Sequence, residues 1–524
     1  MDSIGTGNLR KVIEYGASVF GDRECIIFED KDGNVTGYSY AEVNDRANRY
    51  ANILLSRGIG KGDKVVVHLC NCPEYLFSWF ALAKIGAVMV PTNVLSTAPE
   101  MEHFINYSDA VAIIIQPDYV GLVQELRGKC PRLNKLFIAR TVSWYPNAIL
   151  FPDATLLDDL LAQTSPQLPD IPVDPEDDLI ILFSGNTKAR NSAVQLTHAN
   201  AVFAGIFGAQ AFRVVTEDRH FIVLPLFHVN GLFISCMPTL TAGATIVMAE
   251  QFSASRYMLQ VRRYGVTTAS LVGATVRMVL RQPPQELDGN NKLRLILFAI
   301  PITDEEWDAF EQRFKVRLCD LWGMTETLGA TTINPINGKF KKNCIGLPRL
   351  GNEVKIVDEK GLEVPTGTPG EMVVKGIPGR TIMKGYFKEP DTTREIMPDG
   401  WLHTGDRGFM DAEGYFHFQD RIKDVIKRAG ENISAPEVEL VLKGHPKVKE
   451  AAVISIPDPV RDEAIAAFVV LKDGEESTEA EILSWCTLRL AKFKLPSLVK
   501  IRGSLPRDAT GTVNRNILKR EITA

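Results

Sequence analysis

Short apolar runs alternate with helical patterns along the first two thirds of the chain. The runs at Asp63–Leu69, Leu179–Phe183, His220–His228 and Leu293–Ile300 have the length and composition of buried strands. Stretches such as Pro73–Gly86 place apolar residues at helical spacing between such runs. Strands that alternate with helices predict an α/β fold with layered, largely parallel sheets.

The pattern changes after about residue 340. Glu353–Gly376 reads as strand, turn, strand, and Gly400–Arg421 adds a hairpin at "DAEG", which together predict a small β-rich subdomain. A last unit follows, with its own order of helix, strand, strand and helix. We therefore predict a large N-terminal domain over residues 1–419, a hinge over 420–424 and a small α+β C-terminal domain over 425–524.

Composition narrows the class of protein. A chain of 524 residues is too long for one hydrophobic core, and 45% apolar with 23% charged residues is typical of globular proteins. The net charge of -5 gives no general attraction to nucleic acid or anionic membrane. The eight cysteines are scattered, and neither a signal peptide nor a run of about 20 apolar residues is present. We expect a cytoplasmic protein with no nucleic-acid or membrane partner.

One segment has the layout of a phosphate-binding loop. In "LFSGNTKARNSAVQLTHAN" an apolar strand runs into a turn of small residues, and a helical pattern follows. Such loops direct backbone N–H groups at phosphate and usually need several glycines. Here the loop holds only Gly185. The pattern predicts a nucleotide site that has been altered.

Four further motifs occur in order: "LWGMTET" (Leu321–Thr327), "WLHTGD" (Trp401–Asp406), "DRIKDVIKRAGENISAPEVE" (Asp420–Glu439) and "LPRDATGTVNR" (Leu505–Arg515). With these motifs the chain resembles the adenylate-forming superfamily, and within it the carnitine-type and medium-chain acyl-CoA ligases. The resemblance implies two half-reactions. A carboxylate and ATP form an acyl-adenylate, the small domain then rotates, and the thiol of CoA displaces AMP.

The resemblance implies AMP and adenylate contacts at Trp322, Gly323, Thr187, Asp406 and Arg421. Trp322 would stack on adenine, although a core aromatic is the alternative. Asp406 would accept hydrogen bonds from both ribose hydroxyls, because a carboxylate has two acceptor oxygens.

Thr325 and Glu326 are implied as catalytic residues that contact phosphate, and Glu326 is also a candidate magnesium ligand. Lys423 is implied at the hinge. The turn formed by Ala429, Gly430 and Glu431 would line the CoA tunnel, where Gly430 allows close approach of the backbone to the thiol arm. The implied acyl pocket comprises His228, Gly273, Phe298, Ala299, Ile300 and Pro301.

The chain departs from the family in two places that serve adenylation. Loop positions that hold glycine in the family carry Asn186, Ala189 and Ala193, and Ser192 replaces the loop lysine. In the last motif, Thr512 stands where the family has a catalytic lysine. Loss of one preorganised stabiliser of a charged transition state typically costs roughly 10²–10³ in rate.

These departures leave three hypotheses. In the first, the enzyme transfers the acyl group of a preformed acyl-adenylate to CoA, a separate enzyme supplies the adenylate, and Mg²⁺ is dispensable; this pattern resembles the split ligases of platensimycin-type natural-product pathways. In the second, the chain is a complete ATP-dependent ligase in which Lys188 or Lys519 compensates. In the third, it is an inactive adenylate-binding scaffold. A homodimer is compatible with each.

Overall fold

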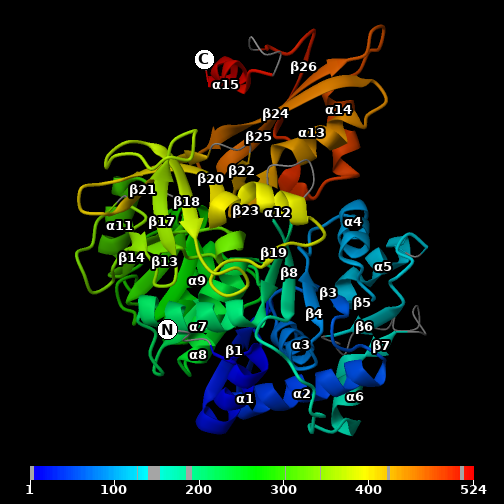
Figure 1. The fold of residues 1–524 in the computed structure, drawn as a ribbon, viewed down its shortest axis with the longest axis vertical. Coiled ribbons are helices and arrows are strands. Elements are labelled where there is room, and N and C mark those ends of the chain that lie inside the picture. Colours follow the sequence, from blue (N-terminus) through cyan, green and yellow to red (C-terminus); the bar gives the residue numbers. More distant parts are fainter. Residues whose placement is uncertain are drawn as a thin grey trace.

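The computed structural model describes residues 5–126, 128–139, 154–184, 192–300, 302–342, 344–421, 425–507 and 513–523. A large unit of sheets and helices carries a smaller C-terminal unit on one side, coloured orange to red in Figure 1. This arrangement confirms the predicted α/β class. Within the described part of the chain, none of the helices has the length and apolar character needed to cross a bilayer.

An eight-stranded sheet forms the first layer of the large unit among the described residues. Its central strands β8, β4, β3, β5 and β6 run parallel, as their continuous apolar sequences predict. In spatial order the strands are β19 (Gly385–Tyr386), β9 (Ser192–Thr197), β8 (Asp178–Ser184), β4 (Val88–Pro91), β3 (Lys64–His68), β5 (Ala112–Ile115), β6 (Lys135–Ile138) and β7 (Thr155–Leu156).

A nine-stranded sheet forms the second layer of the described structure. It is parallel from β14 to β1 and antiparallel at both edges. Its strands, in spatial order, are β16 (Leu347–Pro348), β15 (Thr332–Ile333), β14 (Arg317–Trp322), β13 (Leu295–Ala299), β12 (Thr268–Val272), β10 (Arg219–Ile222), β11 (Thr245–Ala249), β1 (Glu24–Glu29) and β2 (Val35–Ser39).

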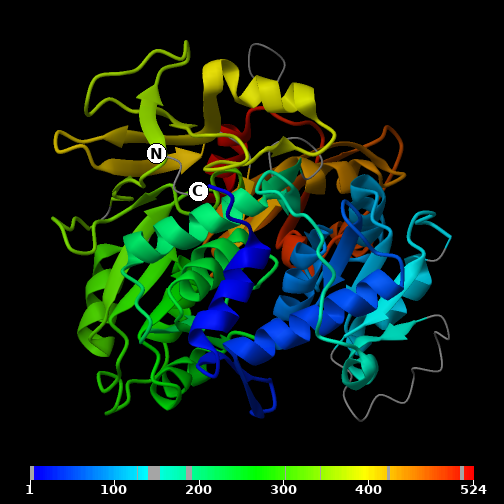
Figure 2. The ribbon, with the colours of Figure 1, turned by 60° about the horizontal axis from the view of Figure 1, so that its bottom comes forward.

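Helices fill the space between and around these sheets. Helix α3 is apolar on all sides and is buried along almost its whole length, as expected for a helix inside a large core. Helix α1, blue in Figure 2, contacts α3, α7 and α8 and so joins the two halves of the large unit. The helices of this unit are α1 (Leu9–Phe20), α2 (Tyr40–Ser56), α3 (Pro73–Lys84), α4 (Ala98–Ser108), α5 (Val120–Leu126), α6 (Leu157–Leu160), α7 (His198–Phe212), α8 (Met237–Thr241), α9 (Ala254–Arg263), α10 (Gly273–Leu280), α11 (Asp304–Phe314) and α12 (Pro390–Ile396).

The prediction of a strand, a loop and a helix in the phosphate segment is wrong at the end of the loop, where a second strand precedes the helix. Residues Ser192–Thr197 are not loop: they form β9, which pairs antiparallel with β8, and α7 begins only at His198. The "AVQL" run inside β9 packs into the apolar cores, and Thr197 then accepts a hydrogen bond from the Asn200 backbone as the N-cap of α7. The loop is therefore the connection of a β-hairpin.

The last part of the chain forms two smaller sheets, as the change in pattern predicts. The antiparallel β-rich sheet comprises β17 (Glu353–Val357), β18 (Gly370–Lys375), β20 (Trp401–Met410) and β21 (Phe416–Arg421). The C-terminal unit comprises β23 (Glu431–Ser434), β22 (Val425–Arg428), β25 (Asp462–Leu471), β24 (Val448–Asp458) and β26 (Leu498–Arg502), with α13 (Ala435–Lys443), α14 (Glu479–Thr487) and α15 (Arg515–Thr523). Its core is a separate apolar cluster.

Candidate active site

Trp322 and Asp406 meet in the interior, although 84 residues separate them. The indole nitrogen of Trp322, at the end of β14, donates to Asp406 Oδ2 over 2.8 Å. The Asp406 side chain belongs to β20 and is fully buried, and its own backbone N–H donates to the Thr404 hydroxyl. Trp322 is only 6% exposed and belongs to the largest apolar cluster. The hydrogen bond from Trp322 therefore fixes the orientation of the Asp406 carboxylate. Much of the Trp322 ring packs in the hydrophobic core.

Glu326 lies beside the end of β8, where the altered loop begins. The strand β14 ends in a one-turn helix, Thr325–Thr327, and the chain packs so closely there that a Cβ on Gly323 would lie 2.0 Å from the Gly329 carbonyl oxygen. Glu326 Oε1 accepts from the Tyr386 hydroxyl over 2.7 Å and from the Ser184 hydroxyl over 3.4 Å. The carboxylate thus faces the position where a phosphate loop would present its ligand.

Several other predicted site residues lie outside the described part of the chain. Thr187, Lys188, Lys423, Thr512 and Pro301 lie there, and so do Asn186 and Ala189; of Arg421 only the backbone is described, as the end of β21. Among described residues, no cluster of three or more histidine, cysteine or acidic side chains suits a metal ion. The assignment of Glu326 to magnesium stays a prediction.

Ser192 and Ala193 are the described part of the altered loop motif. Both are buried at the start of β9, opposite Ser184 and Phe183 of β8. Ala193 packs in the apolar cluster that contains Phe104 and Ile181. A strand position with a buried side chain differs from an open glycine-rich turn, so this end of the motif is built for packing.

The C-terminal unit inserts the turn between β22 and β23 into the other side of the site. Ala429 and Gly430 have φ angles of 53° and 92°, the left-handed backbone of a tight hairpin turn. A Cβ on Gly430 would lie 3.3 Å from Val272 Cγ2 in the large unit. This turn therefore lies close to the end of β12, leaving little room for a side chain at Gly430. The CoA tunnel is predicted at this place.

Glu431 connects the same turn to two segments of the large unit. Its Oε2 lies 3.0 Å from His228 Nε2, and its Oε1 accepts from Asn93 Nδ2 over 3.3 Å. Asn93 follows β4 and is a contact that the motifs did not indicate, because a lone asparagine in a turn is usually structural. The signal that could have found it is its place at the carboxyl end of a parallel strand.

The predicted acyl-pocket residues divide into two groups. Ile300 packs with Leu224, Val272 and Ala274 in a small apolar cluster beside the Gly430 turn, and Gly273 begins α10 there. Ala299 ends β13 next to Ile300. The ring of Phe298 instead packs edge-on against Trp307, 5.1 Å between centroids, in a different core cluster. We therefore assign the Phe298 side chain a structural role.

Asp320 is a buried acid that the sequence motifs did not indicate. It lies on β14, two residues before Trp322 and opposite Phe298 of β13. Burial raises the pKa of Asp320 to about 8, although backbone hydrogen bonding at Leu321 and the charge of Lys427 oppose this shift. Its carboxyl group is therefore mainly protonated near pH 7.

The pair of His228 and Glu431 should make the contact between the two units depend on pH. Burial lowers the pKa of His228, but the charge and hydrogen bond of Glu431 outweigh this effect and hold the pKa above its usual value near 6.5. A raised pKa means that the ion pair stabilises the contact fully below about pH 6.5 and is lost as pH rises through the raised value. Energy transfer between dyes on cysteines introduced at exposed Glu125 and Asp473 should thus fall with rising pH.

Glu431→Gln is the control for this titration, because glutamine keeps the size and hydrogen-bonding capacity of the side chain without its charge. The pH dependence should largely vanish in this variant. An unchanged titration in Glu431→Gln would contradict the assignment. The native cysteines are buried or half-buried, which favours labelling at the introduced sites.

Comparison with known proteins shows the family of this chain. Residues 13–387 match the family model described as AMP-binding enzyme, and residues 437–512 match the AMP-binding enzyme C-terminal domain. The crotonobetaine/carnitine–CoA ligase of Salmonella paratyphi A is 38% identical over 522 residues, covering 99% of this chain and 100% of the relative. The ligase of the same name from Salmonella typhimurium is also 38% identical, over 523 residues with the same coverage.

Two solved structures extend the likeness to three dimensions. The o-succinylbenzoate CoA synthetase of Bacillus subtilis, bound with its product analogue, has a TM-score of 0.83 and 25% identity over 97% of this chain and 98% of that one. ATP-bound MatB of Rhodopseudomonas palustris has a TM-score of 0.71 and 26% identity over 98% and 99%. The matches to both domains and over the full length show that this chain belongs to the AMP-binding, adenylate-forming family and is an acyl-CoA ligase similar to crotonobetaine/carnitine–CoA ligases.

Proposed function

We propose that this enzyme forms acyl-CoA from a preformed acyl-adenylate and CoA, releases AMP, and lacks the adenylation half-reaction. The observation that carries the thioester step is the placement of the Ala429–Gly430 turn against Val272, with Glu431 bonded to His228. A backbone turn at this point can form the wall of a narrow tunnel for a thiol arm. The same placement leaves Asp406 and Trp322 deeper in the site to hold AMP.

The two structural comparisons support this interpretation of the domain arrangement. Their sequence identities to this chain are nearly equal, 25% and 26%, yet their TM-scores are 0.83 and 0.71. The higher score belongs to a synthetase bound with its CoA-product analogue, and the lower to MatB, which scores 0.71 with ATP and 0.70 in its apo form. A different placement of the small domain is a physical reason for such a difference, because rigid-body rotation lowers the match without changing either domain.

Loss of adenylation is supported by substitutions at positions that serve adenylation and that the thioester step does not need. Ser192 replaces the loop lysine, Ala193 replaces a loop glycine and packs in a core, and Thr512 replaces the lysine of the last motif. Lys519, a candidate substitute, lies on α15 and lines the same cavity as Asp462 and Glu463. Figure 1 shows α15 on the side of the small unit away from the large sheets. A separate enzyme would then supply the adenylate, as in split ligases of natural-product pathways.

The proposed reaction is a direct substitution at the acyl carbon. The thiol of CoA passes Gly430, its sulfur bonds to the carbonyl carbon of the mixed anhydride, and the bond from that carbon to the phosphate oxygen breaks. The thiol proton is lost to solvent, and AMP carries away the electron pair. Asp406 would bind the ribose, and Thr325 with Glu326 would face the phosphate. Magnesium is dispensable in this scheme because no pyrophosphate is formed.

A complete ATP-dependent ligase is the second candidate. It is favoured by the similarity to crotonobetaine/carnitine–CoA ligases, which spans 99% of this chain and 100% of the Salmonella paratyphi A enzyme. Lys188 would then have to act in place of the loop lysine. Substrates of the relatives, carnitine and crotonobetaine, are the first acids to test under either candidate.

The two candidates differ in which substrates the purified enzyme uses. Thioester formation would be measured with synthetic crotonobetainyl-, butanoyl- and benzoyl-adenylate plus CoA, and with the matching acids plus ATP, Mg²⁺ and CoA. We expect the rate with acid, ATP and CoA to be at least about 100-fold lower than the rate with adenylate and CoA, because two charge-stabilising groups are lost.

Thr512→Lys is the matched variant for this experiment, because it restores one family group while leaving the thioester site untouched. It should raise the acid-dependent rate and leave the adenylate-dependent rate unchanged. Equal rates from both substrate sets in the wild-type enzyme, with rapid ATP–pyrophosphate exchange, would establish the complete ligase instead.

A further inference from the structure

A buried ionic cluster joins the C-terminal unit to helix α4. Lys494 Nζ lies 2.6 Å from Glu100 Oε1 and 2.7 Å from Glu437 Oε1. Glu100 belongs to the first turn of α4 in the large unit, whereas Glu437 is on α13 and Lys494 is on the short helix Lys492–Lys494 of the small unit. One ammonium group therefore bridges two carboxylates that come from different units.

The ion pairs of this bridge are buried between the two units. The side chains of Lys494 and Glu100 are each only 7% exposed. Burial lowers the pKa of Lys494, but the charges and hydrogen bonds of Glu437 and Glu100 raise it by more than burial lowers it. The pKa is therefore raised overall and the ammonium group stays charged. Burial also raises the pKa of Glu437, and Lys494 opposes that shift. Buried charges persist only with close partners, and removing one partner is strongly destabilising.

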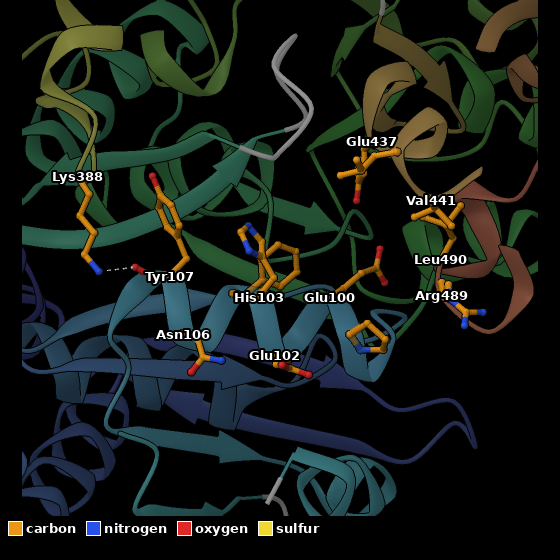
Figure 3. A pocket seen from close by; sticks show the side chains of 13 residues that line it. Glu100, Glu102, His103, Asn106, Tyr107, Lys388, Glu437, Val441, Arg489 and Leu490 are labelled. Carbon is orange, nitrogen blue, oxygen red and sulfur yellow. Dashed lines mark hydrogen bonds between the residues drawn. The ribbon is translucent and has the colours of Figure 1, made fainter. Parts of the chain in front are cut away.

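The cluster adjoins the parts of α4 that lead back to the active site. Thr97, the residue before α4, donates its hydroxyl to the Arg489 carbonyl oxygen of the small unit over 3.3 Å. Asn93, four residues earlier, donates a hydrogen bond to Glu431 in the turn of residues 429–431, here called the tunnel turn. Figure 3 shows Glu437 and Glu100 facing one another across the edge of a cavity of about 720 Å³ that lies between the two units. Cluster and tunnel turn thus rest on one continuous segment.

We propose that Lys494 is a positioning residue for thioester formation: by bridging Glu437 to Glu100 it holds the small unit where Gly430 and Glu431 complete the CoA tunnel. This inference rests on the proposed function, because it takes the observed arrangement to be the one that forms the thioester. Without the ammonium group, Glu100 and Glu437 would repel each other across the contact. Glu100 is therefore the residue that converts an ion pair within the small unit into a link between units.

Glu100→Gln separates the link from the fold. Glu100 Oε2 accepts from the Thr97 backbone N–H in a capping box, a role that glutamine also fills. Lys494 keeps Glu437 as its partner in this variant. We expect kcat/KM for CoA, measured with the best adenylate of the panel, to fall about 10-fold, which corresponds to about 1.4 kcal/mol, because a charge-assisted hydrogen bond across the contact is weakened. Binding of AMP, measured by calorimetry, should be unchanged.

A matched control and a charge exchange keep the test independent of folding. Glu42→Gln makes the same substitution in the capping box of α2 and should leave both readouts unchanged. Glu100→Lys and Lys494→Glu should each be more damaging than Glu100→Gln, and the double exchange should recover most of the activity because a cation again bridges two carboxylates. No recovery in a folded double variant, or full activity in Glu100→Gln, would overturn the inference.

The outcome can be told apart from failure of the proposed function. All variants are assayed with adenylate and CoA, so a wild-type enzyme that also used acid and ATP would refute the loss of adenylation and leave this result standing. Conversely, full activity of Glu100→Gln beside a wild-type enzyme that uses only the adenylate would remove the positioning role alone.

Discussion

Replacing Asp406 by alanine should lower kcat/KM for the acyl-adenylate by about 1,000-fold, because two hydrogen bonds to a buried carboxylate, each contributing about 1.5–3 kcal/mol, are lost together. We propose that these bonds go to the ribose hydroxyls. The substitution also leaves the Trp322 indole N–H without its acceptor in the core. Steady-state rates with the adenylate and CoA, together with AMP affinity by calorimetry, measure the effect.

A graded pair of variants separates the ribose contact from packing. Asp406→Asn keeps one acceptor oxygen for Trp322 and should lose less activity than Asp406→Ala. Asp411→Asn alters another acid of the same β-rich subdomain, which pairs with Lys341 at the surface, and should leave AMP affinity unchanged. Tight AMP binding by folded Asp406→Ala would rule out the proposed contact.

Replacing Gly430 by valine should reduce CoA-dependent thioester formation by at least about 100-fold, which corresponds to roughly 2.7 kcal/mol. A Cβ at this position would lie 3.3 Å from Val272 Cγ2. The φ of Gly430 is 92°, which residues with side chains rarely adopt. The valine methyl groups would also occupy the predicted path of the thiol. We expect a higher KM for CoA and a lower kcat, with AMP affinity retained.

Gly474→Val is the matched control for backbone strain. Gly474 belongs to the same small unit and has a φ of 81°, but a Cβ there would meet no atom within 4 Å. This variant should lose stability, seen as a lower melting temperature, and keep its kinetics below that temperature. Equal loss of activity in both variants would mean that Gly430 acts only through the fold.

Much of the architecture follows from local sequence pattern. The apolar runs around Lys64–His68 and Leu295–Ala299 are strands because β-branched and apolar residues buried on both faces satisfy a parallel sheet. The helical pattern at Pro73–Lys84 lacks a polar face, and this helix is accordingly buried. The change of pattern after residue 340 likewise corresponds to antiparallel strands with tight turns.

Local pattern misled at the altered loop. Strand, small-residue turn and helix predict a phosphate loop, but the six residues before α7 form a strand that pairs with β8 instead. Alternation over so few residues is weak evidence, and the neighbouring strand decides. Phe298 shows the same limit, since its position at a strand end near the site does not reveal that its ring points toward Trp307.

By itself, the sequence determined the family, the order of domains and the residue types at the positions predicted to bind the adenylate and to line the tunnel, because each depends on short motifs. Only the tertiary structure decided which partners these residues have. Trp322 with Asp406, His228 with Glu431 and Glu100 with Lys494 are separated by 84, 203 and 394 residues. Such pairs depend on how the sheets pack and where the small unit rests, and no local propensity encodes that geometry.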